Sequence, residues 1–264
     1  MLLMLPLIAA AWFFGAVCRR MEAGHVLLVF AVPELLHLVR DVLLALALLA
    51  LAAGIVVLLF RPLWLAAVAF GISALALLLS WGVTVPHLLL VLLFFVAALA
   101  HAAITQRDVT LRISFSTGAV GFSQPGFLVA LLLVVAAALY LGSARYARQE
   151  GFSIPAEYAD EFAEHLASRV AAAFPSLIEQ QVYDSVREHT RQLLTTELQR
   201  LMKPVTPYVP IAAALALFLP LLLVCLLLSW GVMPVLWLLF ELFRVTGVTR
   251  VATETIEVQR RVLI

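Results

Sequence analysis

The sequence predicts an all-α integral membrane protein with about seven transmembrane helices, a polar two-helix insert and a short β-hairpin. Of its 264 residues, 64% are hydrophobic and 12% are charged, whereas a soluble domain is about half apolar and a quarter charged. Several apolar segments approach the roughly 20 residues needed to cross a bilayer core about 30 Å thick. One long stretch, residues 144–207, is instead strongly polar.

Two classes of protein are excluded by charge and by cysteine content. The 17 basic and 16 acidic residues leave a net charge of +1, so a nucleic-acid partner has no electrostatic basis. The two cysteines, Cys18 and Cys225, lie at the edge of or inside apolar runs, which does not fit a secreted disulfide scaffold. The partner that the composition does predict is the lipid bilayer.

Seven segments are predicted to span the membrane. They are residues 2–17, 42–60, 63–80, 88–104, 127–143, 211–229 and 232–248. The first could be mistaken for a secretory signal, but the chain begins Met-Leu-Leu-Met and lacks the basic residues that open such a signal. We therefore expect the first segment to be a retained span.

Residues 25–40 are predicted to form an interfacial helix. An apolar run over 26–32 is followed by Pro33, Glu34, His37 and Arg40, so an interfacial helix fits better than a span, with a re-entrant or spanning helix as the alternatives. Glu34 and His37 share one face, as expected of a solvated edge.

Basic residues give the predicted orientation, because cytoplasmic loops collect Lys and Arg. With seven spans, fourteen of the 17 basic residues fall on the side of the insert and the tail 249–264, and Arg61, Arg107 and Arg112 fall on the other. We expect a cell-membrane protein with its N-terminus outside and with the insert and the tail in the cytoplasm.

An outer-face β-hairpin is predicted over 109–123. Val109, Leu111, Ile113 and Phe115 alternate with polar residues, which is the period of a strand with one apolar face. Thr117-Gly118 can turn the chain toward a return strand. An isolated hairpin is marginally stable in water, so this one would lean on lipid or on the helices.

The insert, 144–207, is predicted to be a cytoplasmic helical hairpin. Its first helix begins near Ser153 and ends at Pro175, and a second helix starts with the capping box of Ser176 and Glu179. Apolar residues step by four along both helices and wind around them, which leaves surface for a protein partner or for self-association through 150–203. The candidate partner surface consists of Tyr158, Phe162, Leu166, Val182, Val186 and Leu193.

A seven-residue motif, Leu-Leu-Leu-Ser-Trp-Gly-Val, occurs at 77–83 and again at 226–232. The distinctive residues are Ser80, Trp81 and Gly82 in one copy and Ser229, Trp230 and Gly231 in the other. Both copies are expected to end a span, which would make 208–248 a transmembrane hairpin. Similar helix-end chemistry explains the recurrence, and a duplication of the kind found in secondary transporters is the alternative.

Ionisable residues inside spans mark candidate functional sites. Glu241 and Arg244, three residues apart, are expected to form an intramembrane ion pair. His101 lies near the outer end of the fourth span, where a hydrogen-bonded imidazole is the simpler interpretation.

No catalytic, cofactor-binding or metal-binding motif is present in the sequence. Glu161 and His165 have the spacing of two metal ligands on a helix, although a solvated helix face explains them equally well. The favoured function is a membrane-anchored interaction or assembly scaffold that uses its cytoplasmic hairpin. The alternative is a small secondary transporter or channel, and an enzyme has the least support.

Overall fold

The computed structural model describes residues 4–23, 32–60, 62–111, 118–149 and 204–247, with short pieces between 160 and 193. No strand occurs among these residues, so the predicted all-α class is confirmed for this part of the chain. The long elements are α1 (Leu5–Ala23), α2 (Val32–Leu59), α3 (Leu63–Trp81), α4 (Val85–Leu111), α5 (Gly118–Gln149) and α9 (Val209–Val245), with a short 3₁₀ helix, η3 (Thr206–Tyr208), before α9.

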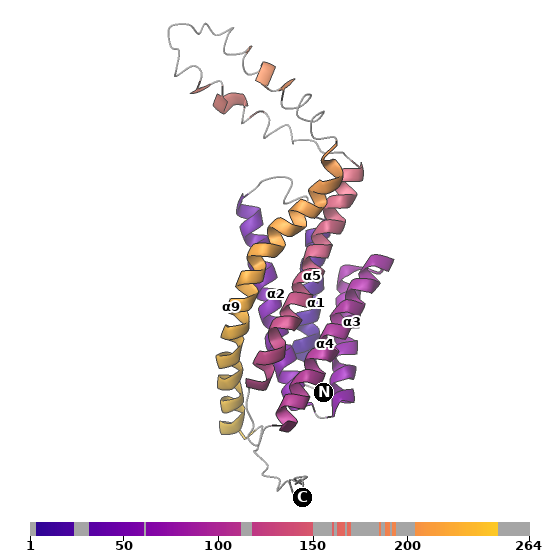
Figure 1. The fold of residues 1–264 in the computed structure, drawn as a ribbon, viewed down its shortest axis with the longest axis vertical. Coiled ribbons are helices and arrows are strands. Elements are labelled where there is room, and N and C mark those ends of the chain that lie inside the picture. Colours follow the sequence, from indigo (N-terminus) through magenta and orange to yellow (C-terminus); the bar gives the residue numbers. More distant parts are fainter. Residues whose placement is uncertain are drawn as a thin grey trace, which may run out of the picture.

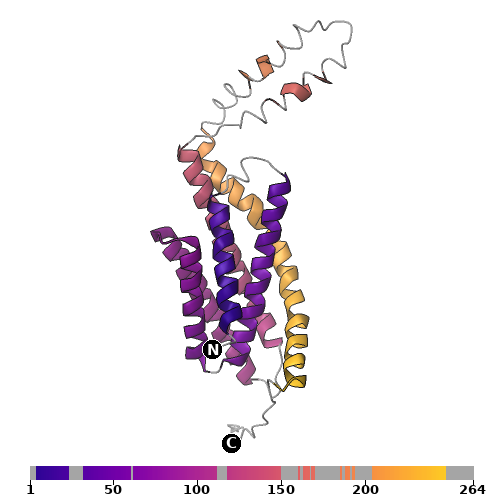
Figure 2. The same ribbon diagram turned by 180° about the vertical axis from the view of Figure 1, so that it is seen from behind.

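The long helices form an elongated up-and-down bundle (Figure 1). Helix α1 contacts α2, α3 and α5, and α9 packs along α5 and α2. The view from behind shows α1 and α2 side by side, with α9 next to α2 (Figure 2). The core is apolar and includes the fully buried side chains of Phe14, Phe70, Phe94, Phe127, Leu46 and Leu131.

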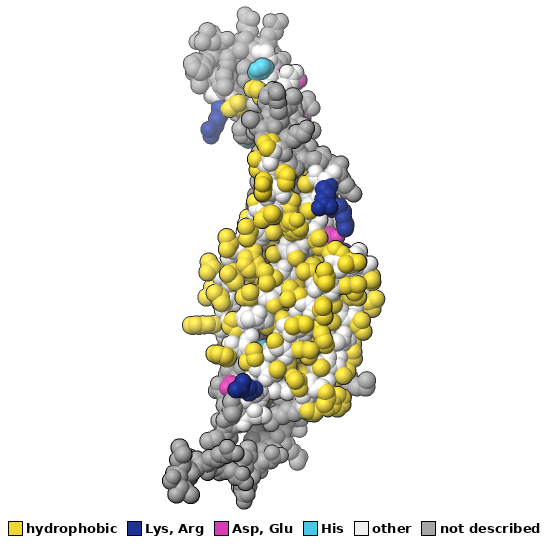
Figure 3. Space-filling model, turned by 45° about the vertical axis from the view of Figure 1, so that its right-hand side comes forward, with side chains coloured by type: hydrophobic (Ala, Val, Ile, Leu, Met, Phe, Trp, Pro, Cys, Tyr) yellow, Lys and Arg dark blue, Asp and Glu magenta, His cyan; other side chains and the backbone are white. Residues whose placement is uncertain are grey.

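Five of the described helices are long and apolar enough to cross a membrane: α2, α3, α4, α5 and α9. Helix α1 is not among these five, and it carries three charged residues near its end, Arg19, Arg20 and Glu22. The prediction of seven spans is therefore wrong for the described chain, although its membrane-compatible character is confirmed. Apolar side chains cover the middle of the bundle, and charged side chains gather toward its two ends (Figure 3).

The predicted transmembrane hairpin 208–248 is one continuous helix, α9, of 37 residues. The helix includes Gly231 and Pro234, where the sequence suggested an interruption, and also Pro220. A proline removes one backbone hydrogen bond and bends a helix, but an apolar surrounding offers the backbone no partners outside the helix. The helix therefore continues through these residues.

Because α9 is one helix and not two, its last residues lie at the other end of the bundle from the one predicted. Gly121, near the start of α5, lies against Met233, so α5 and α9 run antiparallel. The C-terminal end of α9 then lies at the opposite end of the bundle from the C-terminal end of α5, which precedes the insert (Figure 1). The predicted placement of the insert and the tail on one side assumed an extra turn in the chain that α9 does not make.

Two other predicted elements differ from the structure. Residues 32–40 are the first part of α2 and not a separate interfacial helix. The predicted β-hairpin is wrong in the described residues, because 109–111 belong to α4 and 118–123 belong to α5, while 112–117 lie outside the described residues. The alternating pattern was too short to outweigh the continuation of two long helices.

The insert contains fewer residues than the sequence suggested, because α5 extends to Gln149 and η3 begins at Thr206. The 3₁₀ helix η3 packs against α5, so the two described elements that flank the insert are in contact. Of the insert itself, the described pieces are helical.

Candidate functional site

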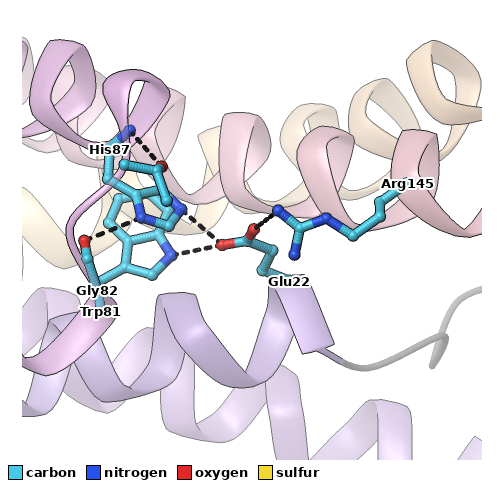
Figure 4. A network of polar contacts seen from close by, with 6 residues as sticks. Glu22, Trp81, Gly82, His87 and Arg145 are labelled. Atoms are coloured by element: carbon cyan, nitrogen blue, oxygen red, sulfur yellow. Dashed lines mark hydrogen bonds and ion pairs between the residues drawn. The ribbon is translucent and has the colours of Figure 1, made fainter.

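A buried carboxylate, Glu22, joins four helices at the insert end of the bundle (Figure 4). Its Oε2 accepts a hydrogen bond from Trp81 Nε1 at 2.9 Å and lies 2.7 Å from His87 Nε2. Its Oε1 forms an ion pair with Arg145 Nη2 at 3.0 Å. The Glu22 side chain is only 7% exposed. These contacts tie the end of α1 to the end of α3, the start of α4 and the last part of α5.

Both ring nitrogens of His87 face oxygen atoms. His87 Nδ1 lies 2.9 Å from the carbonyl oxygen of Gly82, and Nε2 faces the Glu22 carboxylate. A carbonyl oxygen only accepts, so Nδ1 must carry a proton. The Nε2 contact then needs one further proton, held by the ring as an imidazolium or by the carboxyl group. The two groups therefore make a close polar contact of 2.7 Å.

Local sequence places these side chains. Gly82 ends α3 with a φ of 124°, a conformation that favours glycine. This turn brings His87 back over Trp81, and their rings stack with centroids 4.6 Å apart. On α5, Gly142 allows the backbone of Glu22 to approach closely, since a Cβ at 142 would lie 2.4 Å from the Glu22 carbonyl oxygen.

A second buried polar cluster joins α4 and α5 nearer the other end of the bundle. Ser123 Oγ lies 2.7 Å from both His101 Nδ1 and Thr105 Oγ1. The His101 ring stacks on Phe127 with centroids 5.1 Å apart. His101 Nε2 and the side-chain amide of Gln124 are buried without a hydrogen-bond partner among the described residues. On α4, apolar residues such as Phe94 and Ala98 are buried between this cluster and His87.

The predicted pair, Glu241 and Arg244, lies in the last turns of α9. Arg244 donates a hydrogen bond to the Glu241 carboxylate, and the Arg244 side chain is 62% exposed. The pair is therefore at an end of the bundle, outside its core. His101 is buried in the second cluster, and His37 is exposed on α2.

The two copies of the repeated motif have different structures. The serines are alike, because Ser80 Oγ and Ser229 Oγ each donate to the carbonyl three residues earlier. Trp81 is 3% exposed and bonds to Glu22, whereas Trp230 is 81% exposed. Gly82 ends α3, but Gly231 lies inside α9. The common sequence therefore does not produce a pair of matching helical hairpins.

Only part of the candidate partner surface is described. Leu166 and Leu193 lie in helical pieces and are 39% and 48% exposed. His165, from the possible metal-ligand pair, is also exposed, and Glu161 lies outside the described residues. The remaining four residues of the surface, Tyr158, Phe162, Val182 and Val186, lie outside the described residues as well.

The sequence interpretation missed the Glu22 cluster. Glu22 and His87 are 65 residues apart, and no local pattern pairs them. A usable signal was present in each segment: Glu22 lies four residues after the apolar run that ends at Cys18, and His87 follows Trp81-Gly82 by a few residues. Ionisable groups next to the ends of apolar helices must find partners, and these two find one another.

The chain matches no family model, no curated protein and no solved structure in the three comparisons. Its class therefore rests on its own features: an all-helical protein with five membrane-compatible helices and a buried four-helix polar cluster at one end.

Proposed function

We propose that this protein is a membrane-anchored interaction or assembly scaffold, in which the bundle presents the insert 150–203 at one membrane surface. The observation that carries the proposal is the Arg145–Glu22 ion pair. It lies where the last part of α5 packs against the end of α1, immediately before the insert begins. Gly142 brings the two backbones into contact at the same level.

The far end of the insert is also held. Helix α9 begins directly after η3, which packs against α5. Two neighbouring, antiparallel helices therefore support the two ends of the insert, and both helices continue into the bundle. A fixed base of this kind lowers the entropy cost of presenting a recognition surface.

The insert is proposed to face the cytoplasm. By position in the sequence, ten of the 17 basic residues belong to the insert end of the bundle, among them Arg19, Arg20, Arg40, Arg145 and Arg148. A division of ten to seven is less uneven than the fourteen to three expected from seven spans. The difference arises because Arg244 and the basic residues after it follow α9, which ends at the opposite end of the bundle. The larger share still favours the insert end as the cytoplasmic one.

Replacement of 150–203 by a flexible linker of equal length tests the scaffold function. The neighbouring ends of α5 and η3 can be joined in this way without changing the bundle. We expect the variant to keep its thermal stability in detergent and to lose the self-association or covalent crosslinks that the full chain shows in nanodiscs or native membranes. Retained association, or a destabilised bundle, would contradict the proposal.

Point variants refine the same experiment. Leu166→Ser and Leu193→Ser change exposed apolar side chains of the insert and are expected to weaken association. His165→Ala, at an exposed position one residue from Leu166, is the matched control and is expected to leave association unchanged.

A small transporter or channel is the second candidate, favoured by the unpartnered polar atoms of His101 and Gln124 in the bundle interior. Polar groups buried without partners are costly and often mark sites for a ligand or water. Ion flux into liposomes containing the purified protein distinguishes the two functions. A flux of protons, sodium, potassium or chloride that His101→Phe abolishes would favour transport.

A further inference from the structure

Two arginines from different helices converge on one carboxylate at the insert end of the bundle. Asp41 Oδ2 lies 3.2 Å from Arg20 Nη1, and Asp41 Oδ1 lies 3.1 Å from Arg40 Nη2. The arginine side chains are 66% and 67% exposed, whereas that of Asp41 is 18% exposed. Two guanidinium groups and one carboxylate leave a net positive charge on the outside of this group.

Among the described residues, the arginines also retain N–H donors that no acceptor uses. A guanidinium carries five N–H groups in a planar fork that suits phosphate oxygens. Arg20 uses one nitrogen and Arg40 uses two in their bonds to Asp41. The remaining N–H groups of two exposed side chains can therefore bind an anion placed beside Asp41.

Apolar residues continue below each arginine on the same helix face. On α2, Leu44, Leu48, Leu51 and Ile55 follow Arg40 at intervals of three or four residues, and none of them is buried. On α1, Ala16, Phe13 and Ala9 precede Arg20 at similar intervals and are also unburied. Residues at this spacing share one side of a helix, so a basic end and an apolar strip form one surface.

This surface leads into an apolar groove between α1, α2 and α9. The groove has a volume of about 410 Å³, and its lining includes Ala9, Leu48, Leu51, Ile55, Leu236 and Leu239. At 1.5 Å per residue, its α2 wall lies about 12 to 22 Å along the helix from Arg40. One leaflet of the hydrocarbon core is about 15 Å deep. The groove thus begins at the depth of the lower part of an acyl chain whose headgroup is level with Arg40, and it continues past the middle of the bilayer.

We propose that this surface binds one anionic phospholipid, with its phosphate on Arg20 and Arg40 and an acyl chain in the groove between α1, α2 and α9. The charge of the arginine pair selects an anionic headgroup, and the apolar lining excludes a polar occupant. The site lies on the face formed by α1 and α2, with α9 at its edge (Figure 2).

Native mass spectrometry of the full chain with dioleoyl phosphatidylglycerol or dioleoyl phosphatidylcholine tests this site. We expect one tightly held phosphatidylglycerol and clearly weaker binding of the zwitterionic lipid. Arg20→Gln combined with Arg40→Gln should weaken phosphatidylglycerol binding about 30-fold, from the contribution of each basic residue near an anionic lipid. Arg19→Gln, at an exposed position on the same helix end, is the matched control for the loss of one positive charge and should weaken binding about fivefold at most, well below the effect of the double variant.

Two further variants keep the test decisive if the double variant folds poorly. Asp41→Asn removes the competing carboxylate and should tighten phosphatidylglycerol binding. Ala9→Phe fills the groove and should weaken the binding of both lipids. Equal retention of the two lipids, or unchanged or weaker binding by Asp41→Asn, would overturn the headgroup site. Unchanged binding by Ala9→Phe, or full displacement of the lipid by excess inorganic phosphate, would overturn the acyl-chain site.

Discussion

Gly142 on α5 lies directly against the backbone of Glu22 on α1. A Cβ atom at position 142 would be 2.4 Å from the Glu22 carbonyl oxygen and 2.8 Å from its Cα, distances that backbone atoms cannot accommodate without moving. The close approach of these two helices places the Glu22 carboxylate within reach of Arg145, on the same helix as Gly142.

Substitution of Gly142 is therefore expected to separate α1 from α5. Gly142→Ala should lower the free energy of unfolding by about 1 to 3 kcal/mol, the usual cost of overpacking. Gly126→Ala, in the same helix but with open space around its Cβ, is the control and should be neutral or stabilising because alanine favours helix. Thermal unfolding in detergent measures both, and equal effects would contradict the close contact.

Loss of the Glu22 charge is expected to be more harmful than loss of the Arg145 charge. Glu22→Gln leaves the buried donors of Trp81 and His87 facing an amide and should cost about 3 to 5 kcal/mol. Arg145 is 60% exposed, so Arg145→Gln should cost less than about 1 kcal/mol. Unfolding free energies of the two variants in the same detergent provide the comparison, and the reverse order would show that the buried contacts contribute little.

The two glycines of the repeated motif should respond in opposite directions to alanine. Gly82 has a φ of 124°, so Gly82→Ala should cost about 1 to 3 kcal/mol of backbone strain. Gly231 is helical and its Cβ direction is open, so Gly231→Ala should gain up to about 1 kcal/mol. Thermal unfolding separates the two cases, and a matching loss at both positions would indicate that α9 is broken at Gly231.

The Glu241–Arg244 pair is expected to contribute little to stability. From the sequence alone, the pair was predicted to lie within a span, where neutralising one partner should harm more than neutralising both. Because Arg244 is largely exposed, Glu241→Gln, Arg244→Gln and the double variant should each cost less than about 1 kcal/mol. A double-mutant cycle on these three variants measures the coupling energy between the two side chains. A coupling energy of several kcal/mol would show that the pair lies in a low-dielectric surrounding, as the sequence predicted.

Opposite ends of the bundle should be accessible from opposite sides of the membrane. Ser168 lies in the insert and Thr246 lies just after α9, and both are exposed. A membrane-impermeant maleimide should label Thr246→Cys on intact cells and Ser168→Cys only after permeabilisation. The parent chain, whose Cys18 and Cys225 are buried, is the control. Labelling of both variants on the same side would support the seven-span arrangement.

The sequence was sufficient to predict the helical class and the positions of α3, α4 and α5, because long apolar runs have few alternatives in a membrane. It was not sufficient to decide whether a helix stops. The residues Trp-Gly-Val end α3 but lie inside α9. Whether the helix ends at this motif therefore depends on how it packs, and not on the local sequence alone. The period-2 pattern near residue 110 likewise gave way to the helices on either side.

The candidate site was harder to predict than the fold. Glu22, Trp81, His87 and Arg145 lie on four helices, and their meeting depends on how α1 is enclosed by its neighbours. The Glu241–Arg244 pair could be predicted because its contact is local. Contacts three residues apart follow from helix geometry, whereas contacts 65 residues apart follow from the tertiary structure.

Helix α9 is longer than a bilayer is thick, and its length has a consequence for the whole protein. Its 37 residues carry no charge before Glu241 and extend about 55 Å, against about 30 Å of hydrocarbon. Such a mismatch is relieved by tilting, by bending or by local thickening of the lipid. Leu217 and Leu221 are buried where α9 packs along its neighbours, so α5 must share any change in tilt. A change in bilayer thickness is therefore expected to tilt α5 and α9 together.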